Sequence, residues 1–336
     1  MSTHPIEALF GAERRPPLLP VCDHYAGVES RMRKALGLQR EKGPVFDLTL
    51  DLEDGAPVGQ EMALALVMAD ILHSEDNLHG RVGVRVHPVR HPLFQAELDL
   101  LLKHAGDRLA YIMVPKPESL ADVQEAVSRV TRTAAGLGLP AAPPVHVLIE
   151  THGALRDVFA IAALPEVQSL SFGLMDFVSE HHGAIPAQAM TSTGQFQHPL
   201  VMRAKLEIAA AAHCHGKVPS HCVVTEFTDR AALDEAAHKA CRELGYTRMW
   251  SIHPDQIDVI VSAFAPRTTE IETAADILLS AESAKWAPIR HHDRLHDRAS
   301  YRYYWTVLER AHRTGQPLRQ DVRDRFFSDL ACRPAT

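Results

Sequence analysis

The sequence predicts a (β/α)8 barrel, an α/β fold, with a C-terminal helical extension. Short apolar runs rich in β-forming residues alternate with longer Ala- and Leu-rich stretches of helical period. This alternation is typical of a parallel sheet with crossover helices. Eight such runs occur, which is the number that closes this type of barrel. Polar residues follow most of the runs, as expected where strands end at the mouth of a barrel.

The expected elements follow one another along most of the chain. The expected strands cover residues 18–22, 46–50, 82–86, 111–114, 145–149, 169–172, 221–224 and 249–252. The expected helices between them cover residues 60–72, 93–103, 120–136, 198–213 and 230–244. We expect an N-terminal arm at 1–17, the barrel at 18–285 with a last helix at 263–285, and a C-terminal helical extension at 286–336.

Composition restricts the class of protein. The chain has 336 residues, of which 46% are hydrophobic and 23% charged, and such a chain can bury a large core. Its formal net charge of −7 offers no cationic field to a nucleic acid backbone, so we expect no nucleic acid partner. No apolar run approaches the roughly 20 residues that cross a bilayer, and no signal-peptide core begins the chain, so we expect no membrane association.

The five cysteines are odd in number and widely spaced, and none forms a CxxC pair. They are Cys22, Cys214, Cys222, Cys241 and Cys332. This pattern favours neither a disulfide framework nor a zinc knuckle. We therefore expect a reducing cytoplasm.

Two carboxylates follow neighbouring apolar strands. Glu150 comes directly after the fifth expected strand, and Asp176 closes the turn after the sixth. Mg²⁺ takes one or two protein carboxylates and leaves its other positions to water and substrate. These two residues are therefore candidate metal ligands, with helix capping as the structural alternative.

Arg85 replaces an apolar residue within the third expected strand. A buried guanidinium needs anionic partners, either an acidic cluster of the protein or a carboxylate substrate. Asp51 and Glu53 share one face at the end of the second strand, and Asp54 begins the loop. Three carboxylates so close together indicate a cation in the same pocket. The alternatives are a structural ion pair for Arg85 and a solvated charged loop.

The segments at these strand ends resemble one family. They are Asp-Leu-Glu-Asp at 51–54, Val-Arg-Val at 84–86, Val-Pro-Lys-Pro-Glu at 114–118, Ile-Glu-Thr-His-Gly at 149–153, Phe-Gly-Leu-Met-Asp at 172–176, Phe-Thr-Asp at 227–229 and Ile-His-Pro-Asp-Gln-Ile at 252–257. Together, over about residues 15–285, they resemble the HpcH/HpaI aldolase and citrate lyase β-subunit-like family, which includes malyl-CoA lyases. Each segment alone is a weak signal.

The resemblance implies a barrel of the phosphoenolpyruvate/pyruvate superfamily type and a homo-oligomer, a trimer or hexamer. It implies Mg²⁺, or Mn²⁺, at Glu150 and Asp176, and a substrate-binding arginine at Arg85. Gly173 and His253, at the ends of the sixth and eighth strands, are further substrate-binding candidates. Glu53 and Asp54 join Arg85 as catalytic candidates.

The implied activity is a Mg²⁺-dependent carbon–carbon lyase. It would split a 3-hydroxyacyl-CoA, such as a malyl-CoA or citryl-CoA analogue, into an acyl-CoA and a 2-oxo acid. The proton-transfer group stays open between Asp54, His87 and a residue of another subunit. One alternative is a class II aldolase that acts on a free 4-hydroxy-2-oxo acid, and another is a non-catalytic barrel that binds a CoA ester or a protein.

Two departures from the family pattern concern the CoA thioester. His87 stands where the family usually has Asn, and residues 15–22 differ from the usual Arg-Ser-x-Leu-Phe-Val-Pro segment. In relatives that segment helps to seat CoA. The use of CoA therefore stays open at this point.

Histidine clusters and a basic tail complete the pattern. We expect solvated or locally hydrogen-bonded side chains, and no zinc site, at His181, His182, His213, His215, His291, His292 and His296. Residues 284–336 carry eleven basic and six acidic residues. Their aromatic helix at 298–311 packs either on its own barrel or, as we hypothesise, against an acidic partner subunit or the phosphate end of CoA.

Overall fold

The computed structural model describes residues 4–13 and 15–328. Its chain forms two compact units. One unit holds residues 16–264, and the other holds the described residues before 16 together with those from 265 onward. Of the expected features, Cys332 and the first residues of the N-terminal arm lie outside the described ranges.

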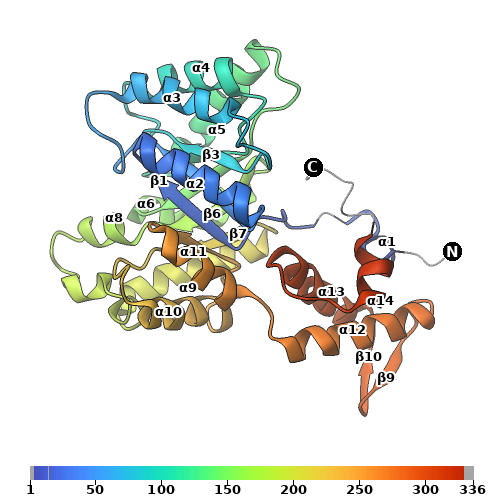
Figure 1. Ribbon diagram of the computed structural model, residues 1–336. Helices are drawn as coiled ribbons and strands as arrows, with labels where there is room; N and C mark the ends of the chain where they lie inside the picture. The colour runs from blue at the N-terminus through green and yellow to red at the C-terminus, as the bar shows by residue number, and fades with distance from the viewer. Residues whose placement is uncertain (1–3, 14, 329–336) are drawn as a thin grey trace. The chain divides into compact units, whose positions relative to one another are not determined.

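Eight parallel strands form a closed barrel in chain order, which confirms the predicted fold (Figure 1). The strands are β1 Cys22–Ala26, β2 Phe46–Asp51, β3 Val82–Arg85, β4 Ile112–Val114, β5 Val145–Ile149, β6 Val167–Phe172, β7 Val218–His221 and β8 Arg248–Ser251. Closure comes from β8, which pairs with β1 through Cys22 and Met249. The carboxyl ends of all eight strands therefore surround one mouth.

Helices connect the strands and bury apolar faces against them. They are α2 Glu29–Lys42, α3 Glu61–His73, α4 Phe94–Ala105, α5 Leu120–Gly136, α6 His152–Arg156, α7 Val158–Ala163, α8 Leu174–Ser179, η1 Ala187–Met190, η2 Gly194–Phe196, α9 Pro199–Cys214, α10 Arg230–Arg242 and α11 Pro254–Phe264. In α5, Val123, Ala126 and Val130 repeat at helical spacing and are buried. The Ser119 hydroxyl caps this helix by accepting from the Asp122 backbone N–H.

Two strands differ in position from the prediction. β1 begins at residue 22, where the expected strand 18–22 ends, and β7 precedes the expected strand 221–224. Both true strands are polar, with sequences CDHYA and VPSH. The search for apolar runs missed them because the barrel interior, which their alternate residues face, is itself polar.

The interior polar network centres on Arg248 of β8, which is fully buried. Its guanidinium lies 2.9 Å from a carboxylate oxygen of Asp23 on the neighbouring strand β1, and it also pairs with Asp47 on β2. Thr49 donates to Asp23 at 2.7 Å, and the Tyr111 hydroxyl lies 2.6 Å from the Thr49 hydroxyl. Because buried charges need partners, these residues depend on one another.

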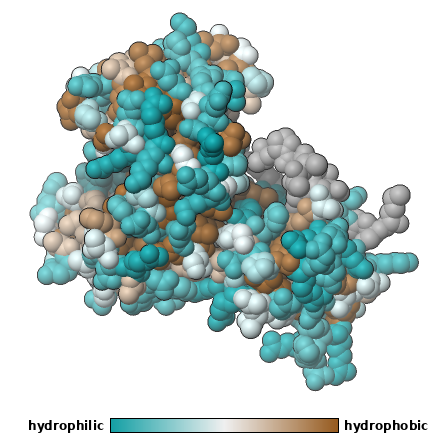
Figure 2. Space-filling model, viewed as in Figure 1, coloured by the Kyte–Doolittle hydropathy of each residue, from teal (hydrophilic) through white to brown (hydrophobic). Residues whose placement is uncertain are grey.

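The second unit is helical and has its own core. Its elements are α1 Pro5–Phe10, α12 Thr268–Ser283, β9 Ile289–His291, β10 Arg294–His296, α13 Arg298–Arg313, α14 Gln320–Val322 and η3 Arg323–Phe327. The α13 residues Tyr301, Trp305 and Leu308 are buried in this core with residues of α1 and α12. The hairpin of β9 and β10 shows mainly hydrophilic side chains on the face seen in Figure 2.

This division differs from the expected boundary at residue 285. The helix expected at 263–285 is α12, and it belongs to the second unit because its apolar residues pack on α13. The aromatic stripe of α13 is therefore buried against α1 and α12 within its own unit. None of the described helices is long and apolar enough to cross a membrane.

Candidate active site

Charged side chains gather at the carboxyl ends of β2 to β6. Asp51 ends β2 and Arg85 ends β3, and the two residues are paired in the register of these strands. Lys116 follows β4, Glu150 follows β5, and Asp176 lies in the first turn of α8. The barrel thus brings together Arg85, Glu150 and Asp176, which the sequence analysis singled out.

Arg85 is 7% exposed and is held by two acidic residues. Its Nε donates to Asp51 Oδ1 at 2.7 Å, a second bond joins Nη2 to Asp51 Oδ2, and Nη1 lies 3.1 Å from Glu53 Oε2. Burial alone would lower the pKa of Arg85, but Asp51 raises it above its usual value. The guanidinium is therefore permanently charged and fixed in orientation.

Asp51 also shapes the loop that follows it. Its two carboxylate oxygens accept from the backbone N–H groups of Glu53 at 3.0 Å and Gly55 at 2.9 Å. A side chain on Gly55 would place its Cβ 2.3 Å from Asp51 Oδ2, so the turn requires glycine. This turn presents Glu53 and Asp54 to the cluster.

Lys116 is the second cation of the cluster. Its ammonium donates to Glu53 and, at 2.6 Å, to Asp54, and lies 3.4 Å from Asp176 Oδ1. Partial burial acts to lower the pKa of Lys116, but the bonds to Asp54 and Glu53 raise it well above its usual value. The pKa of Asp54, which burial alone would raise, is lowered by Lys116.

Glu150 is 1% exposed, and only one of its carboxylate oxygens is satisfied. Oε1 accepts from the Lys116 backbone N–H at 2.7 Å, while Oε2 has no hydrogen-bond partner among the described residues. Burial, reinforced by the negative charge of Asp176, raises the pKa of Glu150 to about 8. The free oxygen of this buried carboxylate is therefore available to a ligand.

Gly173 gives Glu150 the space that it occupies. A Cβ on Gly173 would lie 2.1 Å from Glu150 Oε2 and 2.6 Å from Glu150 Cβ. Gly173 is thus in place beside the candidate metal ligand. Its contact in the structure is with Glu150, and any contact with substrate stays a prediction.

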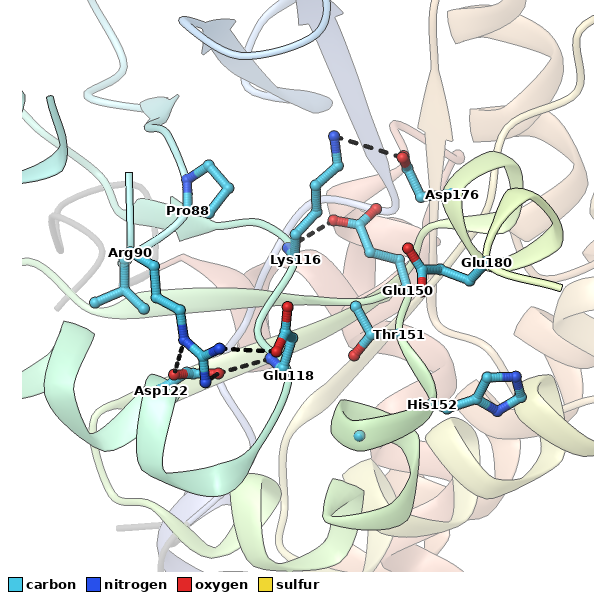
Figure 3. A pocket seen from close by; sticks show the side chains of 12 residues that line it. Pro88, Arg90, Lys116, Glu118, Asp122, Glu150, Thr151, His152, Asp176 and Glu180 are labelled. Atoms are coloured by element: carbon cyan, nitrogen blue, oxygen red, sulfur yellow. Dashed lines mark hydrogen bonds and ion pairs between the residues drawn. The ribbon is translucent and has the colours of Figure 1, made fainter. Parts of the chain in front are cut away.

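A cavity of about 460 Å³ opens beside the cluster (Figure 3). Lys116, Glu150 and Asp176 line one part of it, and Figure 3 shows the Lys116 side chain extending toward Asp176. Another part is lined by Arg90 and His152. The Arg90 guanidinium pairs with Asp122 at 3.0 Å and Glu118 at 2.8 Å. The cavity therefore joins the carboxylates to a polar outer rim.

His253 lies apart from the residues that line this cavity. Its ring stacks on Phe227 with the centroids 5.3 Å apart, and its backbone oxygen accepts from Ser251. His87 is likewise occupied, since its Nδ1 lies 2.5 Å from the buried Glu97 carboxylate. The structure thus places Glu53 and Asp54 near Arg85, and Gly173 beside Glu150. It shows no contact of His253 with these residues.

Histidines among the described residues lie in local contacts. Within residues 4–13 and 15–328, no group of three or more His, Cys, Asp or Glu is arranged to hold an ion. His213 Nε2 lies 2.7 Å from the Gly245 oxygen and His181 Nδ1 lies 2.7 Å from the Phe177 oxygen, so both are locally hydrogen-bonded. Glu150 and Asp176 are two carboxylates only, which is a sufficient protein contribution for Mg²⁺.

Lys116 was given no role by the sequence pattern. Its position in the sequence could have indicated a role in the site, because Lys116 follows the fourth strand as Glu150 follows the fifth. A lysine in a loop gives no sign that its ammonium will reach three carboxylates. Its left-handed backbone, with φ of 48°, also has no sequence signature in a residue other than glycine or asparagine.

Comparison with known proteins identifies the family. The family profile described as HpcH/HpaI aldolase/citrate lyase matches residues 46–254, a range that contains Arg85, Glu150 and Asp176. The chain belongs to the HpcH/HpaI aldolase/citrate lyase family. This match confirms the resemblance of the strand-end segments. The charged cluster at the barrel mouth therefore lies within the part of the chain that matches a family of lyases and aldolases.

Relatives in this family include solved and characterised proteins. A citrate lyase from Burkholderia xenovorans LB400, known from its crystal structure, is 55% identical with a TM-score of 0.83, over 97% of this chain and 100% of that one. An L-malyl-CoA/beta-methylmalyl-CoA lyase of Cereibacter sphaeroides (strain ATCC 17029 / ATH 2.4.9) is 29% identical over 291 residues, 82% of this chain and 89% of the relative. The CitE protein of Mycobacterium tuberculosis, in complex with magnesium, acetoacetate and coenzyme A, shares the fold at 22% identity and a TM-score of 0.65, over 88% and 98% of the two chains.

Proposed function

We propose that this protein is a Mg²⁺-dependent carbon–carbon lyase of a 3-hydroxyacyl-CoA, such as a malyl-CoA or citryl-CoA analogue. It cleaves this thioester to an acyl-CoA and a 2-oxo acid, or catalyses the reverse reaction. The observation that carries the proposal is the buried Glu150 carboxylate, which leaves one oxygen without a partner beside Asp176 and near Arg85. The relatives named as malyl-CoA and citrate lyases support this substrate class.

The residues present fit a hard divalent cation. Glu150 Oε2 is an unsatisfied buried oxygen, and Asp176 supplies a second carboxylate in the same cavity. Oxygen donors of this kind suit Mg²⁺ and also accept Mn²⁺. When bound, the ion supplies Lewis acidity to the carboxylate and oxo oxygens of the 2-oxo acid.

The chain's own residues supply orientation and charge. Arg85, fixed by its two bonds to Asp51, stabilises the negative charge that develops as the carbon–carbon bond breaks. Glu53 positions both cations, because it contacts Arg85 and Lys116. Asp54 is the most exposed carboxylate of the cluster and is kept ionised by Lys116, so it is our candidate for proton transfer at the acyl carbon.

Further expectations complete the proposal. Gly173 and His253 are our candidates for substrate binding. We propose that the protein forms a homo-oligomer, a trimer or a hexamer, and that it works in the cytoplasm. Cys22, Cys214 and Cys222 are free thiols, which suits a reducing compartment. We also propose that the basic helix α13 contacts an acidic partner subunit or the phosphate end of CoA. Its arginines would make this contact, because its aromatic stripe is buried.

A ligand matrix tests the proposal. Thermal melting is followed with Mg²⁺ and glyoxylate, oxaloacetate or pyruvate, with and without acetyl-CoA or propionyl-CoA, and hits are assayed for cleavage. Stabilisation that needs metal, oxo acid and thioester together supports the lyase. Stabilisation by metal and oxo acid alone supports the aldolase, and stabilisation by CoA without metal supports a binding barrel. Asp176→Ala abolishes metal-dependent turnover if the proposal is right, and an active variant that needs no metal contradicts it.

A further inference from the structure

Lys116 contacts every carboxylate of the cluster except Asp51, which is committed to Arg85. Its ammonium reaches Glu53, Asp54 at 2.6 Å and Asp176 at 3.4 Å. Its backbone N–H donates to Glu150 at 2.7 Å. A single residue thus touches both candidate metal ligands, one through its main chain and the other through its side chain.

The backbone contact of Lys116 with Glu150 is fixed, whereas the contact of its ammonium with Asp176 can break. The backbone bond to Glu150 is fixed by the left-handed conformation at φ 48°, which lies between Pro115 and Pro117. The ammonium is at the end of a flexible side chain and has three acceptors. Of these, Asp176 is the most distant, so this pair can break while Glu53 and Asp54 retain the charge.

The ammonium and a divalent cation are alternatives at Asp176. Glu150 Oε2 is buried and has no hydrogen-bond partner among the described residues, so it is available to a cation. Asp176 lines the same cavity and lies 3.4 Å from the Lys116 ammonium. Two cations that share one carboxylate repel each other at short range. Lys116 therefore offsets the charge of Asp176 only until an ion arrives.

We propose that Lys116 is a resident counter-cation of the metal site, displaced from Asp176 toward Glu53 and Asp54 when a divalent ion binds. This inference rests on the proposed function, because it assumes that Glu150 and Asp176 hold the ion. It assigns Lys116 a positioning role. The lysine offsets the mutual repulsion of the carboxylates while no ion is bound, and it lowers the affinity of the site for the ion.

Binding of Mn²⁺, measured by electron paramagnetic resonance of the free ion, tests this role without any assay of turnover. Lys116→Met removes the competing charge and is expected to bind Mn²⁺ at least tenfold more tightly than the wild type. Lys116→Arg keeps the charge and is expected to stay within threefold of the wild type. Arg90→Met is the matched control, since it removes one cation from the same cavity that pairs with Asp122 and Glu118 instead.

The outcomes separate the two proposals. Mn²⁺ binding to the wild type with equal or weaker binding to Lys116→Met overturns the counter-cation and leaves the proposed function standing. An equal gain in Mn²⁺ affinity in Arg90→Met also overturns the counter-cation, because removal of any positive charge from the cavity would then have the same effect. If the folded wild type binds no Mn²⁺ but Lys116→Met does, both proposals fail for the natural protein, because no ion then displaces Lys116 from Asp176. If neither binds, both fail. Thermal melting of each variant verifies that it is folded.

Discussion

Glu150 is buried with only one of its oxygens hydrogen-bonded, so its charged form is costly in the metal-free protein. Its pKa of about 8 lies above the usual value for glutamate, which means that the folded chain binds this proton more tightly than the unfolded chain. The resulting stabilisation is complete below the unfolded pKa near 4.5 and is lost as the pH rises to about 8. A bound cation reverses this balance by favouring the ionised carboxylate.

Glu150→Gln therefore gives a pH-dependent stability difference. Without metal, the free energy of unfolding of the wild type is expected to fall relative to the variant by about 3–5 kcal/mol between pH 5 and pH 8.5. The neighbouring charges of Asp176 and Arg85 are the same in both proteins, so the difference isolates Glu150. Urea unfolding at several pH values measures it. Parallel curves for the two proteins would contradict the raised pKa.

Gly173→Ala tests the close approach of the main chain to Glu150. The added Cβ would lie 2.1 Å from Glu150 Oε2, so the carboxylate has to move. Mn²⁺ affinity is expected to fall at least tenfold, as measured by equilibrium binding. Gly37→Ala in α2 is the matched control, because nothing lies within 4 Å of its added Cβ, and it should leave the affinity unchanged. Equal affinity in both variants would remove Gly173 from the site.

At the scale of elements, the strands show what the sequence could and could not predict. The strands β2, β3 and β5, in which buried apolar residues recur at alternate positions, were located within one residue at each end. β1 and β7 were displaced, because buried polar residues such as Asp23 and Ser220 cannot be distinguished from loop residues without their partners. Arg85, Glu150 and Asp176 could be predicted as candidate site residues because each is a charged residue at or just after the end of a strand. Lys116 was missed because its role comes from three other segments.

Arg248→Met tests whether β8 is held to its neighbours by buried charge. The variant keeps the apolar stem but leaves Asp23 and Asp47 without their main cation, so the free energy of unfolding is expected to fall by about 3–5 kcal/mol. Urea denaturation measures this loss. Arg33→Ala, which breaks an exposed pair with Glu29, should change stability by less than about 0.5 kcal/mol. A double variant with Asp23→Asn is expected to recover part of the loss, and no recovery would contradict the pairing.

At the scale of the whole molecule, two units carry two separate cores. Trp305→Ala empties the centre of the second core and is expected to lower its stability by about 3–5 kcal/mol. Because Glu150 and Asp176 belong to the other unit, Mn²⁺ affinity should stay within twofold of the wild type. Calorimetry and Mn²⁺ binding measure the two effects. Tyr303→Ala, at a residue that is 60% exposed, is the control and should change neither.

The helix α1 lies near the start of the chain, yet its Leu9 is buried with residues of α12 and α13 near the other end. During synthesis from the N-terminus, Leu9 is made long before Ile271 and Trp305, which belong to the same core. The barrel is inserted between the two parts of this core, and its last strand pairs with its first. Each unit is therefore completed only when a segment made late packs on one made early: α12 and α13 on α1, and β8 on β1. Until those segments have been synthesised, the new chain exposes an apolar surface at α1 and an unpaired strand edge at β1, and both need protection from aggregation.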